Sequence, residues 1–262
     1  MPDQSVLHAA ATVRSVLPDS VDVAVVLGSG LGAIAEQFAP LRVLQYRDVP
    51  GCPLPAVPGH SGRLVFGKWE KMRVLIFQGR VHRYEGYSAH TVSFPIRLAH
   101  ALGARALVIT NSSGGIHQKL ASGALMLIEG HIAPPVRHPL RDIAISTNPY
   151  DAAWAHRVAE HARDFGFPLY TGVYAWTLGP CYETKAEIRY FARMGADAIG
   201  MSTVDEVSHA HALGMRVLGV SMITNKAAGL GPMKVSHDDV LAAGDSAKKP
   251  MLRLVQAVLR CL

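Results

Sequence analysis

The glycine-rich segment at residues 28–32, GSGLG, is the first part of the chain whose residue types suggest chemistry. It follows directly on Val23–Leu27, an apolar run of the kind that forms a buried strand in a parallel sheet. Glycines let the backbone approach a ligand closely, and N–H groups at the carboxyl end of such a strand attract anions. We therefore expect a phosphate site at Ser29, with a tight turn that binds nothing as the alternative. The spacing G-x-G-x-G differs from the dinucleotide-binding G-x-G-x-x-G, which argues against a nicotinamide-dependent oxidoreductase.

Two further loops carry donors that suit an oxyanion. Arg80 and His82 lie two residues apart on a polar loop, and His60 lies on a separate loop rich in proline and glycine. Together with Ser29 these side chains supply charge-assisted donors for a divalent oxyanion. The alternative for each histidine is an ordinary surface position.

A second set of residues suits a flat, polar organic ligand. The carboxylate of Glu183 only accepts hydrogen bonds, whereas the amide of Asn225 both donates and accepts. This pair fits a heterocycle whose edges mix donors and acceptors. Tyr84 and Met201 suit the covering of a sugar, with a place in the hydrophobic core as the alternative for both.

Other chemistries find less support. His209 and His211 are two positions apart on an expected helix, so their side chains diverge and make a poor metal pair. The zinc-protease, serine-hydrolase and P-loop motifs are missing from the sequence. Cys181 is a weak candidate nucleophile because no base is paired with it by spacing. We expect neither a metal nor an organic cofactor.

The candidate residues share a position at the ends of expected strands. Beyond Ser29, the polar clusters that follow strands are Asn111–Gly115, Gly179–Thr184, Met201–Thr203 and Asn225–Lys226. Capping-box patterns begin the expected helices at Thr184 and Thr203, with a shorter-armed variant at Ser236. Because the carboxyl ends of parallel strands meet at one rim of a sheet, these clusters predict a common pocket.

The alternation of strands and helices predicts an α/β fold with a largely parallel central sheet flanked by helices. A hairpin of Leu64–Gly67 and Arg73–Gln78 is expected to add antiparallel members. The expected helices are Val6–Leu17, Gly32–Phe38, Thr91–Leu102, Asp151–Phe165, Lys185–Met194, Val204–Leu213 and His237–Leu259. The remaining expected strands are Arg105–Thr110, Ala124–His131, Tyr170–Thr177, Asp197–Met201 and Arg216–Thr224.

Composition narrows the class of protein. The chain has 262 residues, of which 49% are hydrophobic, so it can form a sizeable core. Its net charge of +6 comes from basic residues spread singly, which does not indicate a nucleic-acid partner. Three cysteines without C-x-x-C spacing favour a reducing compartment. With neither a secretory signal nor a membrane-spanning run in view, we expect a cytoplasmic protein.

The order of motifs from about residue 20 onward resembles the trimeric purine nucleoside phosphorylases. The matching motifs are GSGLG (28–32), VPGHSGRL (57–64), QGRVHRYEGY (78–87), TNSSGG (110–115), GPCYET (179–184), GADAIGMSTVDEV (195–207) and ITNKAAG (223–229). The resemblance implies one α/β domain over residues 1–262, with a mixed, distorted β-barrel at its centre, assembled as a homotrimer. It also implies a pentosyltransferase of purine salvage that reversibly phosphorolyses purine nucleosides to free base and ribose 1-phosphate.

The resemblance assigns roles to individual residues. The implied phosphate ligands are Ser29, His60, Arg80, Ser202 and the backbone of Ser112. The implied ribose contacts are Tyr84, Met201 and His237, with His82 between phosphate and sugar. Glu183 is implied to accept from purine N1 and a 2-amino group, Tyr182 to stack on the base, and Asn225 to bond N7 and O6.

These roles imply catalysis by positioning and electrostatics, with inorganic phosphate as the nucleophile and Asn225, Glu183 and His82 nearest to the chemistry. An amide at position 225 donates to O6, whereas relatives that take 6-amino purines have an aspartate there. We therefore expect inosine and guanosine, with their deoxy forms, to be preferred over adenosine. The alternatives are a methylthioadenosine-type phosphorylase and a nucleoside-binding protein with weakened turnover.

The sequence departs from the family pattern in three places. TNSSGG stands where TNAAGG is more usual, and Asp205 stands where a proline is usual. The connection 133–150 is shorter than in the family, and no phenylalanine occurs between Phe94 and Phe165 to close a neighbouring subunit's ribose site.

Overall fold

A computed structural model describes residues 3–17, 20–38, 40–133, 148–231 and 237–262, with the backbone alone at 237–246. Its strands are β1 (Val23–Leu27), β2 (Pro40–Gln45), β3 (Arg63–Trp69), β4 (Met72–Gln78), β5 (Ala106–Gly115), β6 (Leu125–Ile132), β7 (Leu169–Trp176), β8 (Ala198–Gly200) and β9 (Arg216–Lys226). Its α-helices are α1 (Gln4–Arg14), α2 (Ala89–Val92), α3 (Phe94–Ala101), α4 (Ala152–His161), α5 (Lys185–Arg193), α6 (Val204–Ala212) and α7 (His237–Arg260). Short 3-10 turns are η1 (Gly32–Phe38), η2 (Tyr46–Asp48), η3 (Arg83–Glu85) and η4 (Ala162–Asp164).

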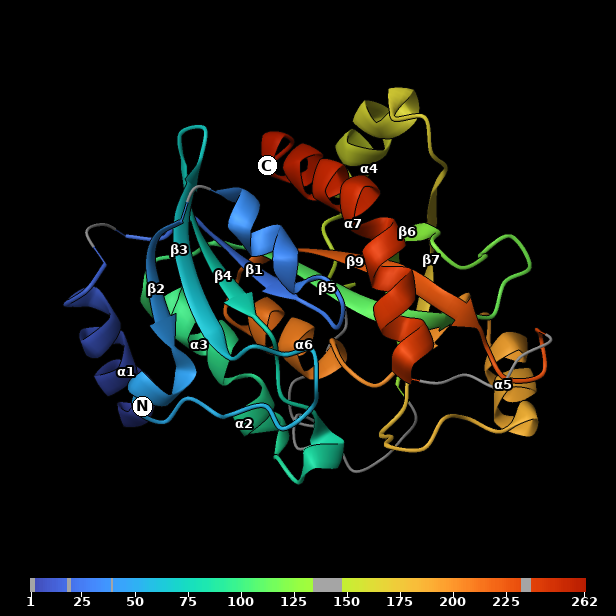
Figure 1. The fold of residues 1–262 in the computed structure, drawn as a ribbon, viewed down its shortest axis with the longest axis horizontal. Coiled ribbons are helices and arrows are strands. Elements are labelled where there is room, and N and C mark those ends of the chain that lie inside the picture. The colour runs from blue at the N-terminus through green and yellow to red at the C-terminus, as the bar shows by residue number, and fades with distance from the viewer. Residues whose placement is uncertain (1–2, 18–19, 39, 134–147, 232–236) are drawn as a thin grey trace.

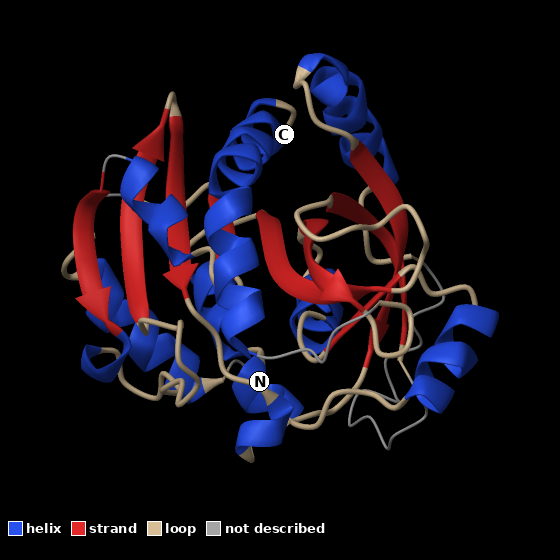
Figure 2. Ribbon diagram, turned by 45° about the vertical axis from the view of Figure 1, so that its right-hand side comes forward, coloured by secondary structure: helices blue, strands red, loops and turns tan. Residues whose placement is uncertain are grey.

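The strands form one sheet that partly closes on itself. Their order is β2-β3-β4-β1-β5-β8-β7-β6-β9, and β9 also pairs with β5 (Figure 1). That extra pairing makes a barrel of β5, β8, β7, β6 and β9, from which β1, β4, β3 and β2 extend as an open sheet. The curved strands of the barrel are seen in Figure 2.

Strand β1 shows how the sequence builds two core layers. All five of its residues are buried, and successive side chains point to opposite faces of the sheet. Ala24 and Val26 join a core under α1, α3 and α6, whereas Val23, Val25 and Leu27 join a core under η1, α4 and α7. Burying one such large apolar side chain contributes about 1.5–3 kcal/mol. The helices thus cover both faces of the sheet (Figure 2).

Most of the expected elements are confirmed, and the hairpin is formed by β3 and β4. The sheet, however, is more mixed than strand–helix alternation predicts. Among the described strands the antiparallel pairs are β2–β3, β3–β4, β5–β8 and β6–β9. The mixed barrel implied by the family resemblance is therefore the better description of the fold.

Three local features differ from or refine the expected elements. Strand β2 is not among the expected elements; it is a short edge strand that begins at a proline, and its residues Pro40–Val43 are exposed. The expected helix Thr91–Leu102 is broken at Ser93, and Pro95 lies in the first turn of α3, where its lack of an N–H costs little. Strand β5 does not end at Thr110 but continues to Gly115, with a register shift between Ser113 and Gly114, because β9 supplies backbone partners along its whole length.

No helix within the described ranges is long and apolar enough to cross a membrane.

Candidate active site

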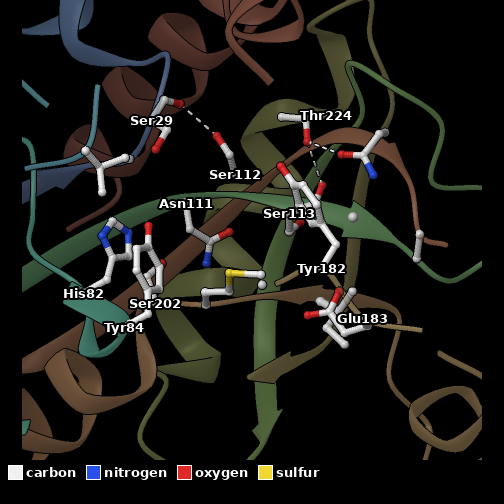
Figure 3. A pocket seen from close by; sticks show the side chains of 18 of the residues that line it. Ser29, His82, Tyr84, Asn111, Ser112, Ser113, Tyr182, Glu183, Ser202 and Thr224 are labelled. Atoms are coloured by element: carbon white, nitrogen blue, oxygen red, sulfur yellow. Dashed lines mark hydrogen bonds between the residues drawn. The ribbon is translucent and has the colours of Figure 1, made fainter. Parts of the chain in front are cut away.

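The polar clusters that the sequence analysis places at strand ends line one pocket. The space within it, including the part open to solvent, is about 860 Å³, and Figure 3 shows most of the side chains that line it. The expected site residues along its wall are Ser29, His60, Arg80, His82, Tyr84, Ser112, Tyr182, Glu183, Met201, Ser202 and Asn225. His237 is different, since its side chain lies outside the described residues. The structure therefore brings together eleven of the twelve named residues.

The glycine turn after β1 is packed directly on β5. A Cβ atom at position 28 would lie 2.8 Å from the Asn111 Cα and 3.0 Å from the Thr110 carbonyl oxygen, so only glycine fits without a backbone shift. The Ser112 hydroxyl donates to the Ser29 carbonyl at 2.8 Å (Figure 3). The Ser29 hydroxyl in turn lies 3.1 Å from His60 Nε2. One serine of TNSSGG thus orients the turn that carries the first candidate phosphate ligand.

Arg80 is a buried cation with an unused donor. Its Nη1 donates to the Ser202 hydroxyl at 2.9 Å, and its Nε lies 3.4 Å from Glu206 Oε1. Arg80 is 2% exposed and Glu206 fully buried. Within the described part of the chain, Arg80 Nη2 is buried and has no hydrogen-bond partner. A buried charged donor without a partner destabilises a protein by several kcal/mol. The unpaired Nη2 of this pocket-lining arginine therefore suits an acceptor bound in the pocket.

The contacts around Arg80 determine which way the hydroxyls of Thr203 and Ser202 donate their protons. Thr203 Oγ1 accepts from Asn111 Nδ2 at 2.8 Å and lies 3.4 Å from Arg80 Nη1, so its own proton is left for Ser202 Oγ at 3.2 Å. Ser202 Oγ then accepts from both Thr203 and Arg80. Its remaining capacity is as a donor, which suits an oxyanion in the pocket.

Thr203 holds a strained backbone conformation beside this donor. Its φ of 81° and ψ of −48° form a γ-turn closed by the Val204 N–H and the Ser202 carbonyl at 3.0 Å. A β-branched residue rarely has positive φ, and such a turn costs about 1–3 kcal/mol. The Glu206 carboxylate accepts the Thr203 N–H at 3.0 Å and offsets part of that cost. The strain therefore serves to present Ser202 at the start of α6.

The loop after β4 carries His82, whose ring contacts the carboxylate of Glu85. Glu85 Oε1 accepts from the His82 backbone N–H at 2.7 Å and lies 2.9 Å from His82 Nδ1, while Glu85 Oε2 accepts from the Ala56 N–H at 2.8 Å. Burial would raise the pKa of Glu85, but these hydrogen bonds hold it below its ordinary value. Burial lowers the pKa of His82, although the hydrogen bond to Glu85 opposes this. In the neutral ring the proton lies on Nδ1, so Nε2 is left as an acceptor.

Tyr84 stacks on His82 with ring centroids 4.7 Å apart and 14° between the planes (Figure 3). Burial raises the pKa of the Tyr84 hydroxyl to about 12, so the ring stays neutral. Gly179 packs against the same tyrosine. Its φ is +73°, and a Cβ there would lie 2.5 Å from Met201 Sδ and 2.9 Å from Tyr84 Cδ1. These contacts form the part of the wall that suits a sugar.

The amide of Asn225 has a fixed orientation. One side-chain atom lies 2.8 Å from the Lys226 carbonyl oxygen, which only accepts, so that atom is Nδ2. The other atom is then Oδ1, and it accepts from the Thr224 hydroxyl at 2.7 Å (Figure 3). One N–H and one oxygen lone pair of the amide are left for a ligand.

Glu183 lies in the same pocket, below Tyr182 in the view of Figure 3. Its Oε1 accepts from the Thr177 hydroxyl at 2.5 Å. Tyr182 is 46% exposed at the mouth. The capping box predicted at Thr184 is confirmed, because Thr184 and Glu187 exchange hydrogen bonds at the start of α5, directly after Glu183.

Sequence reasoning missed several residues that support this site. These are Glu85, Thr177 and Thr224, together with Glu206 in its role beside Arg80. Only Glu85 gave a usable sequence signal, since it lies three residues after His82. The other partners come from distant segments or act through a single hydroxyl.

Comparison with known proteins agrees with this geometry. The family model described as the phosphorylase superfamily matches residues 22–260. Purine nucleoside phosphorylase 1 of Bacillus subtilis is 41% identical over 261 residues, covering 96% of each chain. The purine nucleoside phosphorylase of Mycobacterium tuberculosis is 43% identical over 239 residues, covering 91% of this chain and 88% of the relative.

A solved structure gives the same result for the fold. The crystal structure of a schistosome purine nucleoside phosphorylase in complex with hypoxanthine matches with a TM-score of 0.87 and 31% identity, covering 98% of this chain and 96% of the other. The chain therefore belongs to the phosphorylase superfamily and, within it, to the purine nucleoside phosphorylases.

Proposed function

We propose that this enzyme phosphorolyses 6-oxopurine nucleosides, namely inosine, guanosine and their deoxy forms. One observation carries the proposal: a single pocket joins a buried arginine with an unpaired N–H to an amide of fixed orientation. The first group calls for an oxyanion. The second offers one donor and one acceptor side by side, which complements O6 and a protonated N7 of a 6-oxopurine.

The proposed phosphate site consists of Arg80, Ser202, Ser29 and His60, with the backbone N–H of Ser112. Support for it comes from the proton directions, because Ser202 is left as a donor and Arg80 as an unpaired cation. Tyr84 and Met201 cover the ribose, and His82 lies between ribose and phosphate. We assign His237 to the 5′-hydroxyl from the family resemblance alone.

The proposed reaction breaks the C1′–N9 bond and forms a bond from C1′ to a phosphate oxygen. The electron pair of the broken bond goes to the purine, which takes up a proton at N7 from solvent, while the hydrogenphosphate nucleophile releases one proton to solvent. Asn225 Oδ1 accepts from that N7–H and Nδ2 donates to O6, while Glu183 accepts from N1–H. The phosphate charge beside C1′ stabilises the positive charge that develops on the sugar, so the protein contributes by position and electrostatics.

The direct test is phosphate-dependent release of base from inosine, guanosine and adenosine. We expect inosine and guanosine to be cleaved and adenosine to be a poor substrate. A preference for adenosine or methylthioadenosine would contradict the base assignment. Tight inosine binding without base release at saturating phosphate would instead indicate a binding protein.

The variant Arg80→Ala tests the phosphate end of the pocket separately from the nucleoside end. Arg80→Ala is expected to raise the KM for phosphate far more than the KM for inosine, because it removes the buried cation. An unchanged phosphate dependence would remove Arg80 from the phosphate site.

We also propose a homotrimer, on the strength of the family resemblance. Sedimentation equilibrium at several protein concentrations tests this, and a monomer at all of them would contradict it.

A further inference from the structure

The hydroxyl of Thr177 is the feature of the site that the proposed reaction leaves without a role. Thr177 directly follows β7 and is half-buried. Its backbone N–H donates to the Gly200 carbonyl at 2.9 Å, which anchors it to β8 beside Met201. Its Oγ1 donates to Glu183 Oε1 at 2.5 Å.

This contact is the one that fixes the carboxylate. Among the described residues Glu183 Oε2 has no hydrogen-bond partner, so the anchored Thr177 hydroxyl alone restrains the end of the side chain. A glutamate side chain has several rotatable bonds, and binding is weakened if these must become ordered only when the ligand binds. Because the Thr177 hydroxyl is itself fixed to the barrel, it orders the Glu183 side chain already in the free enzyme.

The chain path between the two residues supports the same arrangement. The connection from β7 passes Gly179, which lies so close to Met201 and Tyr84 that a Cβ there would clash with both. The α5 capping box at Thr184 fixes the other end, one residue after Glu183. The backbone on both sides of Glu183 is therefore held, and the Thr177 hydroxyl completes the restraint at the side chain.

We propose that Thr177 is a positioning residue for purine recognition. It orients the Glu183 carboxylate so that Oε2, and the second lone pair of Oε1, can accept from the base. The inference rests on the proposed role of Glu183. It adds a prediction on specificity, because the two 6-oxopurines differ at this edge. Hypoxanthine offers the carboxylate one N–H, at N1, whereas guanine offers N1–H and a 2-amino group. Only a carboxylate held in one plane receives both donors of guanine well.

The test uses Thr177→Val, which keeps the shape and removes the hydroxyl, and Thr177→Ser, which retains it. Thr171→Val is the matched control, since Thr171 is an exposed threonine on β7, the strand that Thr177 follows. We expect Thr177→Val to lower kcat/KM for guanosine about ten-fold, the scale of one hydrogen bond to a charged group, and to lower that for inosine less. The ratio of guanosine to inosine kcat/KM should fall, the KM for phosphate should stay close to that of Thr171→Val, and Thr177→Ser should restore the ratio.

The ratio is the decisive readout. If Thr177 only closed the turn, Thr177→Val would lower kcat/KM for guanosine and for inosine by the same factor and would also raise the KM for phosphate. The ratio of guanosine to inosine kcat/KM would then not change. That outcome, or a Thr177→Val enzyme equal to Thr171→Val, would overturn the inference. Thr177→Ala serves as a second hydroxyl-free variant if the valine enzyme folds poorly, with calorimetric binding of guanine and hypoxanthine as its measurement.

Glu183→Ala separates this inference from the proposed function. If Glu183→Ala leaves guanosine cleavage intact, the proposed role of Glu183 is wrong. If Glu183→Ala abolishes cleavage while the Thr177 variants match the control, only the Thr177 inference is wrong. In the double variant Thr177→Val/Glu183→Ala, the threonine change should add nothing further, because it acts through the carboxylate.

Discussion

The fixed amide of Asn225 is the group that we propose to distinguish 6-oxo from 6-amino purines. The Lys226 carbonyl and the Thr224 hydroxyl define which end of the side chain donates. An aspartate of the same shape would offer acceptors only, and one of its oxygens would face the Lys226 carbonyl.

Asn225→Asp is therefore expected to lower kcat/KM for inosine by about two orders of magnitude, the scale of losing a transition-state donor. The kcat/KM for adenosine, whose 6-amino group donates a hydrogen bond, should fall much less or rise. Steady-state kinetics with both nucleosides measure the change in their ratio. An unchanged ratio would show that residue 225 does not read position 6.

Ser112 allows a second prediction at this scale. Its hydroxyl holds the Ser29 carbonyl, and a hydrogen bond of this type contributes about 1 kcal/mol. Ser112→Ala should raise the KM for phosphate roughly five-fold with little effect on the KM for inosine. Ser93→Ala is the control, because Ser93 is a buried serine with a similar bond to the His90 carbonyl, away from the pocket. Equal phosphate KM values for the two variants would contradict the role.

Much of the site could be predicted at the residue scale, because glycine turns, loop histidines and polar strand ends mark it locally. Thr177 and Thr224 could not be found in this way. Their contribution depends on which atom of a neighbouring side chain they meet, and that follows only from the packed structure. The strain at Thr203 was equally hidden, since no local pattern predicts positive φ for a β-branched residue.

At the scale of elements, the first helix shows how capping links sequence to stability. Asp3 caps α1 by accepting from the Ser5 N–H at 3.0 Å, and it also pairs with Arg97 of α3. The hydrogen bond from the Ser5 hydroxyl, with help from the Ser5 N–H and Arg97, lowers the pKa of Asp3 from 3.8 to about 2 against the opposing effect of burial. The cap therefore joins two helices on one face of the sheet.

Asp3→Ala should lower the free energy of unfolding by about 1 kcal/mol at neutral pH. Between pH 4 and pH 2 the unfolded chain binds more protons at this residue than the folded one, so the contribution of Asp3 is lost as the pH falls through that range. Urea unfolding at neutral pH and near pH 2 measures the difference between wild type and variant, which should shrink at low pH. A difference that is the same at both would contradict the assigned cause.

Elements were easier to predict than their connections in space. A buried strand such as β1 follows from its run of valines, whereas the break at Ser93 that separates α2 from α3 was not expected. The pairing of β5 with β9 joins residues about 110 positions apart, for example Asn111 with Ser221, and no local pattern contains it. The alternation of strands and helices therefore did not indicate the antiparallel pairs β5–β8 and β6–β9, and β5 was expected to stop where its residues become polar.

At the scale of the whole molecule, the buried pair of Arg80 and Glu206 ties the loop after β4 to α6. Their atoms lie 3.4 Å apart, and both side chains are almost completely shielded from water. Burial raises the pKa of Glu206, although the charge of Arg80 opposes this. Removing one partner of such a pair leaves an uncompensated charge and costs about 3–5 kcal/mol.

Glu206→Gln should therefore lower Tm, and inorganic phosphate should raise the Tm of this variant by more than it raises that of wild type. The bound anion replaces the missing negative charge and stabilises the folded state through binding. Calorimetry with and without phosphate measures both shifts. Asp22→Asn, which affects a partly exposed pair with Arg73, is the control and should show the wild-type phosphate shift. A phosphate shift in Glu206→Gln no larger than in the control would contradict the coupling.

The closure of β5 on β9 has a consequence for how the molecule behaves among other proteins. A sheet that closes into a barrel pairs most of its strand edges, and in the described strands β2 forms the end of the open part of the sheet, with one edge free along its length. That edge begins with Pro40, which has no N–H to offer, and carries the charge of Arg42 between the apolar Leu41 and Val43. Proline and a charged residue at this end of the sheet disfavour pairing with a strand of another protein.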